Sequence, residues 1–269
     1  MSWRRIRALV GKELAELARN RSALLPVIAL ALFCVALPLL IGVVIPLFFQ
    51  DPLTGDQDLS RALARSGLPF DRDRLTEEAV VQAFIFQQFM LMQILVPVTG
   101  AIAFAGHSLI GEKQGRTLEP LLATPLTTTE LLVGKGIGAL LPSLGIMVAA
   151  WLLYLALIGI FALPGVLSSV FNLRTVLLVL GVGPIASLVA LQIGVIVSSK
   201  VSDPRTAQQY GALLILPLTA LFAAQFTGRM TMHVGAILAL MLGLGAVWVL
   251  LVLFGVAIFE REAILTRWK

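Results

Sequence analysis

Polar side chains in otherwise apolar surroundings are mostly amides, and they cluster in one stretch of the chain. Gln82, Gln87, Gln88 and Gln93 all fall within residues 80–108, which are otherwise strongly apolar and rich in phenylalanine. Such a helix could line a translocation path for an amphipathic substrate. The alternative is that the amides hydrogen-bond between helices and hold a bundle together. The sequence leaves both interpretations open.

Residues suited to catalysis or metal binding are sparse. The two histidines, His107 and His233, stand at the ends of apolar stretches, and the one cysteine, Cys34, lies inside another. We find no nucleophile elbow, HExxH pair or phosphate-binding GxxxxGK[ST] loop. We therefore expect no catalytic residues, no metal site and no cofactor in this chain.

The composition is that of an integral membrane protein. Of the 269 residues, 58% are hydrophobic and 13% are charged, and the mean hydropathy is +0.96. Soluble domains carry about 25% charged residues. We attribute the net charge of +5 to membrane topology and expect no binding to nucleic acid.

Six apolar stretches are long enough to cross a bilayer, which takes roughly 20 residues. We predict an all-α membrane protein with a single transmembrane domain over 1–269, and with spans at about 23–49, 80–108, 136–162, 175–199, 207–227 and 233–258. None of these stretches contains Asp, Glu, Lys or Arg. Ion-coupled carriers usually hold such residues at membrane depth, so this absence argues against one.

Residues 2–22 precede the first span and have the pattern of an amphipathic helix at the membrane interface. Apolar residues recur at helical spacing, and charged residues, Glu13 among them, take the other positions. The apolar positions are Trp3, Ile6, Val10, Leu14 and Leu17. A plain anchor whose arginines keep the N-terminus inside would show the same pattern.

The distribution of Lys and Arg predicts that both termini are cytoplasmic. Inner segments would hold Arg4, Arg5, Arg7, Lys12, Arg19, Arg21, Lys113, Arg116, Lys135, Lys200, Arg205, Arg261, Arg267 and Lys269; outer segments would hold Arg61, Arg65, Arg72, Arg74, Arg174 and Arg229. The largest outer loop, 51–79, is predicted to contain a short helix near 57–66, and Thr76 is suited to cap the second span.

Small residues recur at every fourth position in three stretches, a spacing that lets helix backbones approach closely. The sets are Gly134 and Gly138; Ala186, Ala190 and Gly194; and Gly235, Ala239 and Gly243. The pattern does not tell whether the partner helix belongs to the same chain or to another subunit. Pro97, Pro142, Pro184 and Pro217 are expected to kink their helices.

Residues 109–135 form the longest polar segment on the predicted cytoplasmic side. The segment opens with mixed charges and carries Leu118, Leu121 and Leu122 at helical spacing, which predicts a short amphipathic helix over 112–124. Pro125 should end this helix. Thr127 and Glu130 fit a capping box at the start of the next helix.

This segment resembles the cytoplasmic segment of ABC-2 type permeases. The matching residues are Glu112-Lys113, Thr117-Leu118-Glu119, Leu121-Leu122, Ala123-Thr124-Pro125, Glu130 and Gly134-Lys135. The chain departs from the family pattern where Arg116, and not glycine, directly precedes Thr117. Weaker similarities lie at Lys12-Glu13-Leu14 and at Ser202-Asp203-Pro204-Arg205.

The resemblance implies an ABC-2 (type V) exporter-like fold and the role of a permease subunit. Such a subunit moves a substrate, here unidentified, out of the cytoplasm with a second permease, identical or different. A separate cytoplasmic ABC ATPase would bind the ATP and Mg²⁺. The residues that would couple to the ATPase are Glu112, Lys113, Arg116, Thr117, Leu118, Glu119, Leu121 and Leu122. The implied location is the cytoplasmic membrane of a bacterium or archaeon.

Two other functions fit the sequence. One is an ATPase-recruiting anchor or regulatory subunit without its own transport path. The other is a stand-alone channel or secondary carrier, which the missing intramembrane charges disfavour.

The predicted topology can be tested by thiol labelling in a Cys34→Ala background. A cysteine introduced in the 55–74 loop should react with an impermeant maleimide added outside intact cells. A cysteine at Gln114 should react only after the cells are opened. The opposite labelling pattern would reverse the orientation.

Overall fold

The computed structural model describes residues 2–49, 55, 57–66, 75–114, 128–200, 209, 215–227 and 232–258. Within these ranges the chain is helical and contains no strand. The elements are α1 (Trp3–Arg19), α2 (Arg21–Leu39), η1 (Leu40–Val44), α3 (Ile45–Phe49), α4 (Gln57–Ser66), α5 (Glu77–Phe89), η3 (Met90–Ile94), α6 (Leu95–Gln114), α8 (Thr128–Phe161), α9 (Val166–Val170), α10 (Leu173–Val176), η4 (Leu177–Val182), α11 (Gly183–Lys200), α13 (Ile215–Phe226) and α14 (Val234–Ile258).

Five helical stretches are long and apolar enough to cross a membrane, which confirms a helical multi-pass protein. They are Arg21–Phe48, Glu77–Ser108, Val133–Phe161, Leu173–Val197 and Val234–Phe254. The fifth predicted span, 207–227, is represented by the shorter apolar helix Leu216–Phe226. Most of its N-terminal part, including 210–214, lies outside the described residues.

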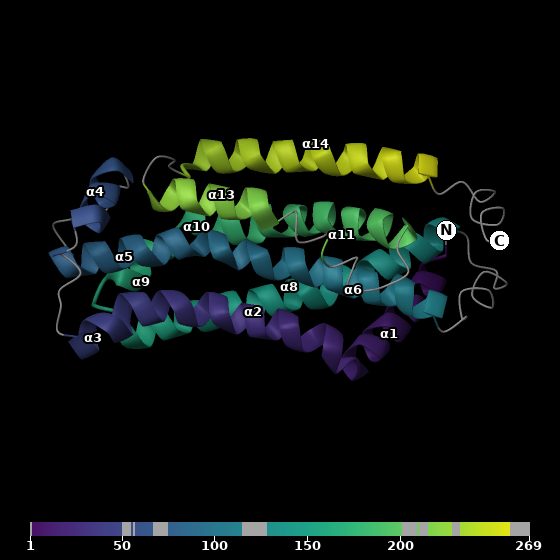
Figure 1. Ribbon diagram of the computed structural model, residues 1–269, viewed down its shortest axis with the longest axis horizontal. Helices are drawn as coiled ribbons and strands as arrows, with labels where there is room; N and C mark the ends of the chain where they lie inside the picture. The colour runs from purple at the N-terminus through teal and green to yellow at the C-terminus, as the bar shows by residue number, and fades with distance from the viewer. Residues whose placement is uncertain are drawn as a thin grey trace.

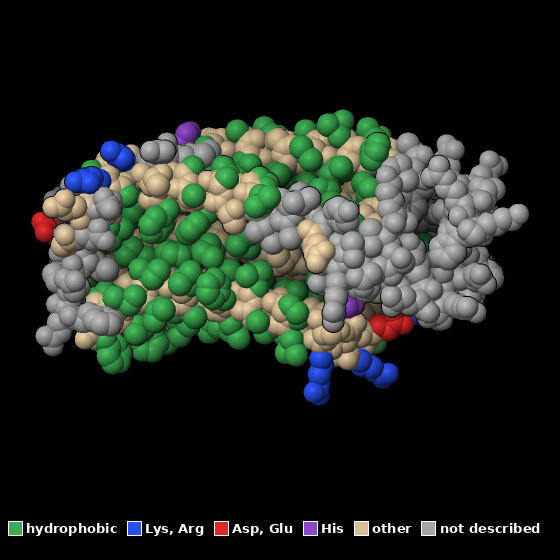
Figure 2. Space-filling view, viewed as in Figure 1, with side chains coloured by type: hydrophobic (Ala, Val, Ile, Leu, Met, Phe, Trp, Pro, Cys, Tyr) green, Lys and Arg blue, Asp and Glu red, His purple; other side chains and the backbone are tan. Residues whose placement is uncertain are grey.

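The spanning helices run along the long axis of an elongated bundle (Figure 1). Helix α1 and the C-terminal end of α14 lie at one end, and α4 and α9 lie at the other. Lys, Arg, Asp and Glu side chains on the visible face gather toward the two ends, and apolar side chains cover the middle (Figure 2). This arrangement matches a bundle whose apolar middle is embedded in lipid.

The second span lies at the centre of the bundle. It runs through α5, η3 and α6, and 83% of its most apolar stretch is buried, against 6% for α14. Thr76 Oγ1 accepts a hydrogen bond from Ala79 N at 3.3 Å, which confirms the predicted cap. Helix α4 confirms the short helix predicted in the preceding loop.

Three spans change helix type close to a proline. The second span is a 3₁₀-helix over Met90–Ile94, shortly before Pro97. The fourth is a π-helix over Leu177–Val182, directly before Gly183 and Pro184, and the first becomes π-helical just after Pro38. Proline lacks the N–H that an α-helix needs and crowds the carbonyl four residues earlier. Pro142, by contrast, lies inside α8 with no change of helix type.

Small residues bring α6 close to both of its main neighbours, α8 and α11. A Cβ added at Gly100 would lie 2.8 Å from Ser143 Cβ of α8. A Cβ at Gly194 of α11 would lie 3.4 Å from Ile102 Cα of α6. The predicted small-residue spacing in the fourth span therefore serves packing within this chain. Gly243 of α14, from another predicted set, has no such neighbour within 4 Å.

We predict that Gly100→Leu lowers the stability of the purified protein, whereas Gly145→Leu on α8 does not. The added side chain at 100 would overlap Ser143, and overpacking a tight contact costs about 1–3 kcal/mol. A Cβ at Gly145 meets nothing within 4 Å. Thermal unfolding in detergent compares the two variants, and equal melting temperatures would contradict the packing described here.

Candidate functional site

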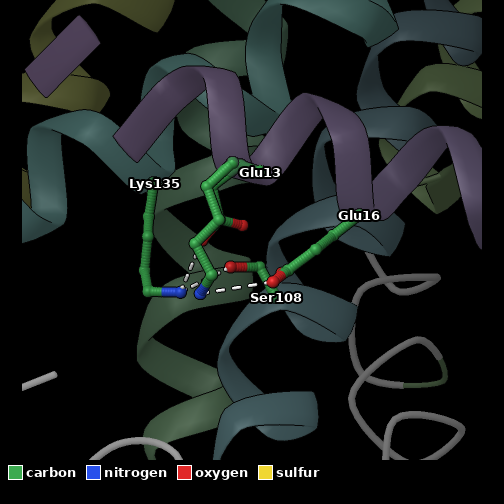
Figure 3. Close-up of polar contacts among 5 residues, drawn as sticks. Glu13, Glu16, Ser108 and Lys135 are labelled. Carbon is green, nitrogen blue, oxygen red and sulfur yellow. Dashed lines mark hydrogen bonds and ion pairs between the residues drawn. The ribbon is translucent and has the colours of Figure 1, made fainter. Parts of the chain in front are cut away.

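A buried ion pair joins α1 to α8 at the end of the bundle where α1 lies. The Lys135 ammonium donates to Glu13 Oε1 at 2.9 Å and to Ser108 Oγ of α6 at 2.8 Å. The two charged side chains are only 5% and 7% exposed. Figure 3 shows Lys135 reaching beneath α1 toward Glu13, with Ser108 beside the pair. One ammonium group thus connects α1, α6 and α8.

The glycines on either side of Lys135 explain why α1 can lie so close to α8. A Cβ at Gly138 would stand 2.7 Å from Glu13 Cβ, and a Cβ at Gly134 would stand 2.6 Å from Leu9 Cδ2. Larger residues at either position would push α1 away and separate the charges. The surface formed by Gly134 and Gly138 therefore packs against α1, a helix of the same chain.

A second polar contact holds the beginning of α1. Glu130 is 2% exposed, and its Oε1 accepts a hydrogen bond from the backbone N–H of Ser2. Its other oxygen lies 3.8 Å from Arg5 Nη1. The capping-box partner Thr127 lies outside the described residues, so that prediction is untested. The Glu130 carboxylate provides a contact to α1 that the sequence did not suggest.

The buried face of α1 differs from the predicted apolar face. Ile6, Leu9 and Glu13 are the buried residues of this helix, whereas Trp3 is 67% exposed. Placing Glu13 among the outward polar residues was therefore wrong. The reason is that α1 rests against α8, where Lys135 offers a counter-charge, so the helix face turned inward includes a carboxylate.

An exposed ion pair on α1 contrasts with the buried one. Lys12 Nζ and Glu16 Oε1 are 3.4 Å apart, with side chains 38% and 57% exposed. Exposed pairs contribute about 0–1 kcal/mol because water screens them. Removing one partner of a buried pair costs about 3–5 kcal/mol, because an uncompensated charge is left in the interior. The two pairs therefore offer a matched comparison on one helix.

The predicted ATPase-coupling residues lie along the chain between Ser108 of α6 and Lys135 of α8, which the buried contact joins. Glu112 and Lys113 fall in the last turn of α6, where the backbone but not the side chains is described. The other predicted residues, Arg116, Thr117, Leu118, Glu119, Leu121 and Leu122, lie outside the described residues, as does the predicted 112–124 helix beyond Gln114. Their role remains a prediction.

Three of the four candidate path glutamines link the second span to other elements. Gln82 Nε2 donates to Gly42 O at 2.8 Å, and its Oε1 accepts from Leu163 N at 2.7 Å. Gln87 Nε2 donates to Ser169 O at 2.7 Å. Gln88 Nε2 donates to Gln225 O at 2.8 Å, and Gln225 Nε2 donates to Gln88 Oε1 at 2.7 Å. These bonds match the interhelical role considered for the amides.

Gln93 is the exception among the four. It sits in the 3₁₀ segment and is fully buried, and neither its Nε2 nor its Oε1 has a hydrogen-bond partner among the described residues. No candidate path glutamine is exposed, since all four are buried. A transport path along this helix therefore stays a prediction.

Comparison with known proteins agrees with this architecture. The model of the family described as ABC-2 family transporter protein matches residues 7–235. The chain belongs to this family. It is thus the membrane-embedded permease component of an ABC transport system, as the resemblance of segment 108–135 implied. The comparison with curated proteins found no match.

The sequence motifs contain both residues of the buried ion pair, but they do not indicate that the two side chains meet. Gly134-Lys135 and Lys12-Glu13-Leu14 were both noted as similarities to the family, at positions more than a hundred residues apart. The available signal was a lysine between two glycines at the start of a span. A cation in such a close-packed position needs a partner, and Glu13 is the only acid among the buried residues of α1.

We predict that Lys135→Met and Glu13→Gln each destabilise the protein strongly, while the double variant recovers most of the loss. Each single change leaves one partner buried without its counterpart, at about 3–5 kcal/mol for the uncompensated charge. Lys12→Met should cost no more than about 0–1 kcal/mol. Melting temperatures in detergent provide the comparison. Additive losses in the double variant would show that the two side chains do not act as a pair.

Proposed function

We propose that the chain is the permease subunit of an ATP-driven exporter that moves a substrate out of the cytoplasm with a separate ATPase. The observation that carries this proposal is the family match over residues 7–235. The described helices support it, because they form an apolar bundle whose charged side chains on the visible face lie toward its ends (Figure 2). The absence of a phosphate-binding loop from the sequence is consistent with an ATPase on another chain.

The proposal includes six spans, with α13 forming the end of a fifth span over about 207–227. Both termini then lie on one side, which agrees with α1 and the end of α14 sharing one end of the bundle. The excess of Lys and Arg favours the cytoplasm for that side. The family resemblance implies that the cell is a bacterium or archaeon. Helix α1 would lie at the membrane interface, with exposed Trp3 and its arginines toward lipid headgroups.

In the working transporter, two permease subunits, identical or different, would combine with two ATPase subunits. The segment between α6 and α8 would dock on the ATPase through Leu118, Leu121 and Leu122. ATP-driven closure of the ATPase pair would then favour one of two arrangements of the spans. Because α6 belongs to the most buried span, displacement of its cytoplasmic end would reach the centre of the bundle.

The docking role predicts different outcomes for two substitutions in this segment. Leu122→Asp would bury a charge in an apolar contact, at several kcal/mol unless it is paired. We expect it to abolish co-purification with the ATPase. Glu119→Arg would change a surface charge worth about 0–1 kcal/mol and should reduce recruitment only in part.

Immunoblots of the membrane fraction must show both variants at wild-type levels, so that loss of binding is not loss of folding. Wild-type recruitment of the ATPase by both variants would remove this segment from the contact and overturn its proposed role.

A further inference from the structure

The buried contact among Glu13, Lys135 and Ser108 occupies a distinctive place relative to the polar segment. Ser108 belongs to the end of the second span, and Lys135 belongs to the start of the third. Their hydrogen bond therefore closes the base of the segment that lies between them. The bond ties the end of α6 to the start of α8.

The first span is joined to the same contact through α1. Only Asn20 separates α1 from α2, and its Oδ1 accepts hydrogen bonds from Ala23 N at 3.3 Å and Ser22 Oγ at 2.7 Å. This cap fixes the start of α2 directly after the end of α1. Glu13 also ties α1 to Lys135, so a chain of polar contacts connects the first three spans.

We propose that Lys135 and Glu13 are positioning residues for energy coupling, forming a charged joint through which the 109–135 segment moves α1, α6 and α8 as one unit. The joint rests on the proposed permease function and specifies which residues transmit the motion. Lys135 is the central member, because its ammonium contacts both Glu13 and Ser108.

Charge, and not only packing, is what suits this contact to the role. Apolar side chains of similar volume can stabilise a fold as well as a buried ion pair does. An apolar contact, however, has no directional requirement, so it would tolerate small shifts of α1 along α8. A hydrogen-bonded ion pair fixes one register, since each donor must meet its acceptor within a narrow range of distance and angle. A variant with an uncharged pair should therefore keep the stability of the fold but lose the coupling to ATP.

The test uses the complex of full-length permease and its ATPase in nanodiscs, in a Cys34→Ala background. Reporter cysteines are placed at Ser60 of α4 and Ser168 of α9, at the end of the bundle opposite α1. The rate of reaction with an impermeant maleimide is measured without nucleotide and with Mg-ATP and vanadate. In the unmodified joint we expect this rate to change roughly fivefold or more at one or both reporters, the lower range of ordinary coupling between sites.

Three double variants decide the outcome. Glu13→Gln with Lys135→Met should fold, bind the ATPase and support ATP hydrolysis, yet lose the nucleotide-dependent change in labelling. Glu13→Lys with Lys135→Glu reverses the pair and should restore the change, because the Ser108 hydroxyl can donate as well as accept. Lys12→Met with Glu16→Gln, the exposed pair on the same helix, should behave as wild type.

A full nucleotide response in the neutral Gln/Met variant would reduce the pair to a structural contact and overturn the proposal. Failure of the reversed pair to restore the response, with the ATPase bound, would also overturn it. So would a wild-type complex that binds the ATPase but shows no nucleotide response at either reporter. A wild-type permease that recruits no ATPase would instead reject the proposed function, which separates the two failures.

Discussion

The ion pair between the carboxylate of Glu13 and the ammonium of Lys135 holds α1 against α8, because separating the two would leave a buried charge without its partner. They meet 2.9 Å apart in a contact that water barely reaches. The close approach of α1 and α8 depends on this pair and on the two glycines that make room for it. Removing the lysine side chain would leave a buried carboxylate facing α8. The packing of α1 against α8 would then be destabilised.

The interior of the bundle is organised by neutral groups instead. Gln82, Gln87 and Gln88 of the second span reach backbone or amide groups on other elements. A neutral amide is far less costly to place among apolar helices than an ion, and a hydrogen bond to a neighbouring helix satisfies it. Charges thus hold the end of the bundle where α1 packs, and amides join the second span to elements farther from that end, α9 among them.

Gln93 departs from this pattern at the point where the second span also departs from α-helical geometry. Its amide has no partner among the described residues, and it lies in the 3₁₀ segment that packs against the π-helical segment of the fourth span. A buried amide without a hydrogen bond costs about 1–3 kcal/mol. The segment around Gln93 therefore contributes less to the stability of the fold than the segment around Gln82 and Gln88, where the amides are hydrogen-bonded.

Local patterns in the sequence determined the class of protein, the positions of most spans, the short helix before the second span and its Thr76 cap. Each of these depends on residues close together in the chain, through hydropathy, helical periodicity or a turn of backbone. The ordered motif over 108–135 also determined the family, which the match over 7–235 confirms. Hydropathy predicts six spans, and the described residues include five long apolar helices and the shorter helix Leu216–Phe226 of the predicted fifth span.

Only the tertiary structure decided which faces meet. Apolar helix faces are satisfied equally by lipid and by protein, so hydropathy does not tell a buried face from an outer one. The spacing of Gly134 and Gly138 allowed a partner, but the fold made that partner α1, with Leu9 and Glu13 against the two glycines. Glu13 looks like a surface residue in its own helix and becomes buried because Lys135, far along the chain, supplies its counter-charge. Long-range electrostatic pairing of this kind has no local signature, which is why it emerged from the fold and not from the sequence.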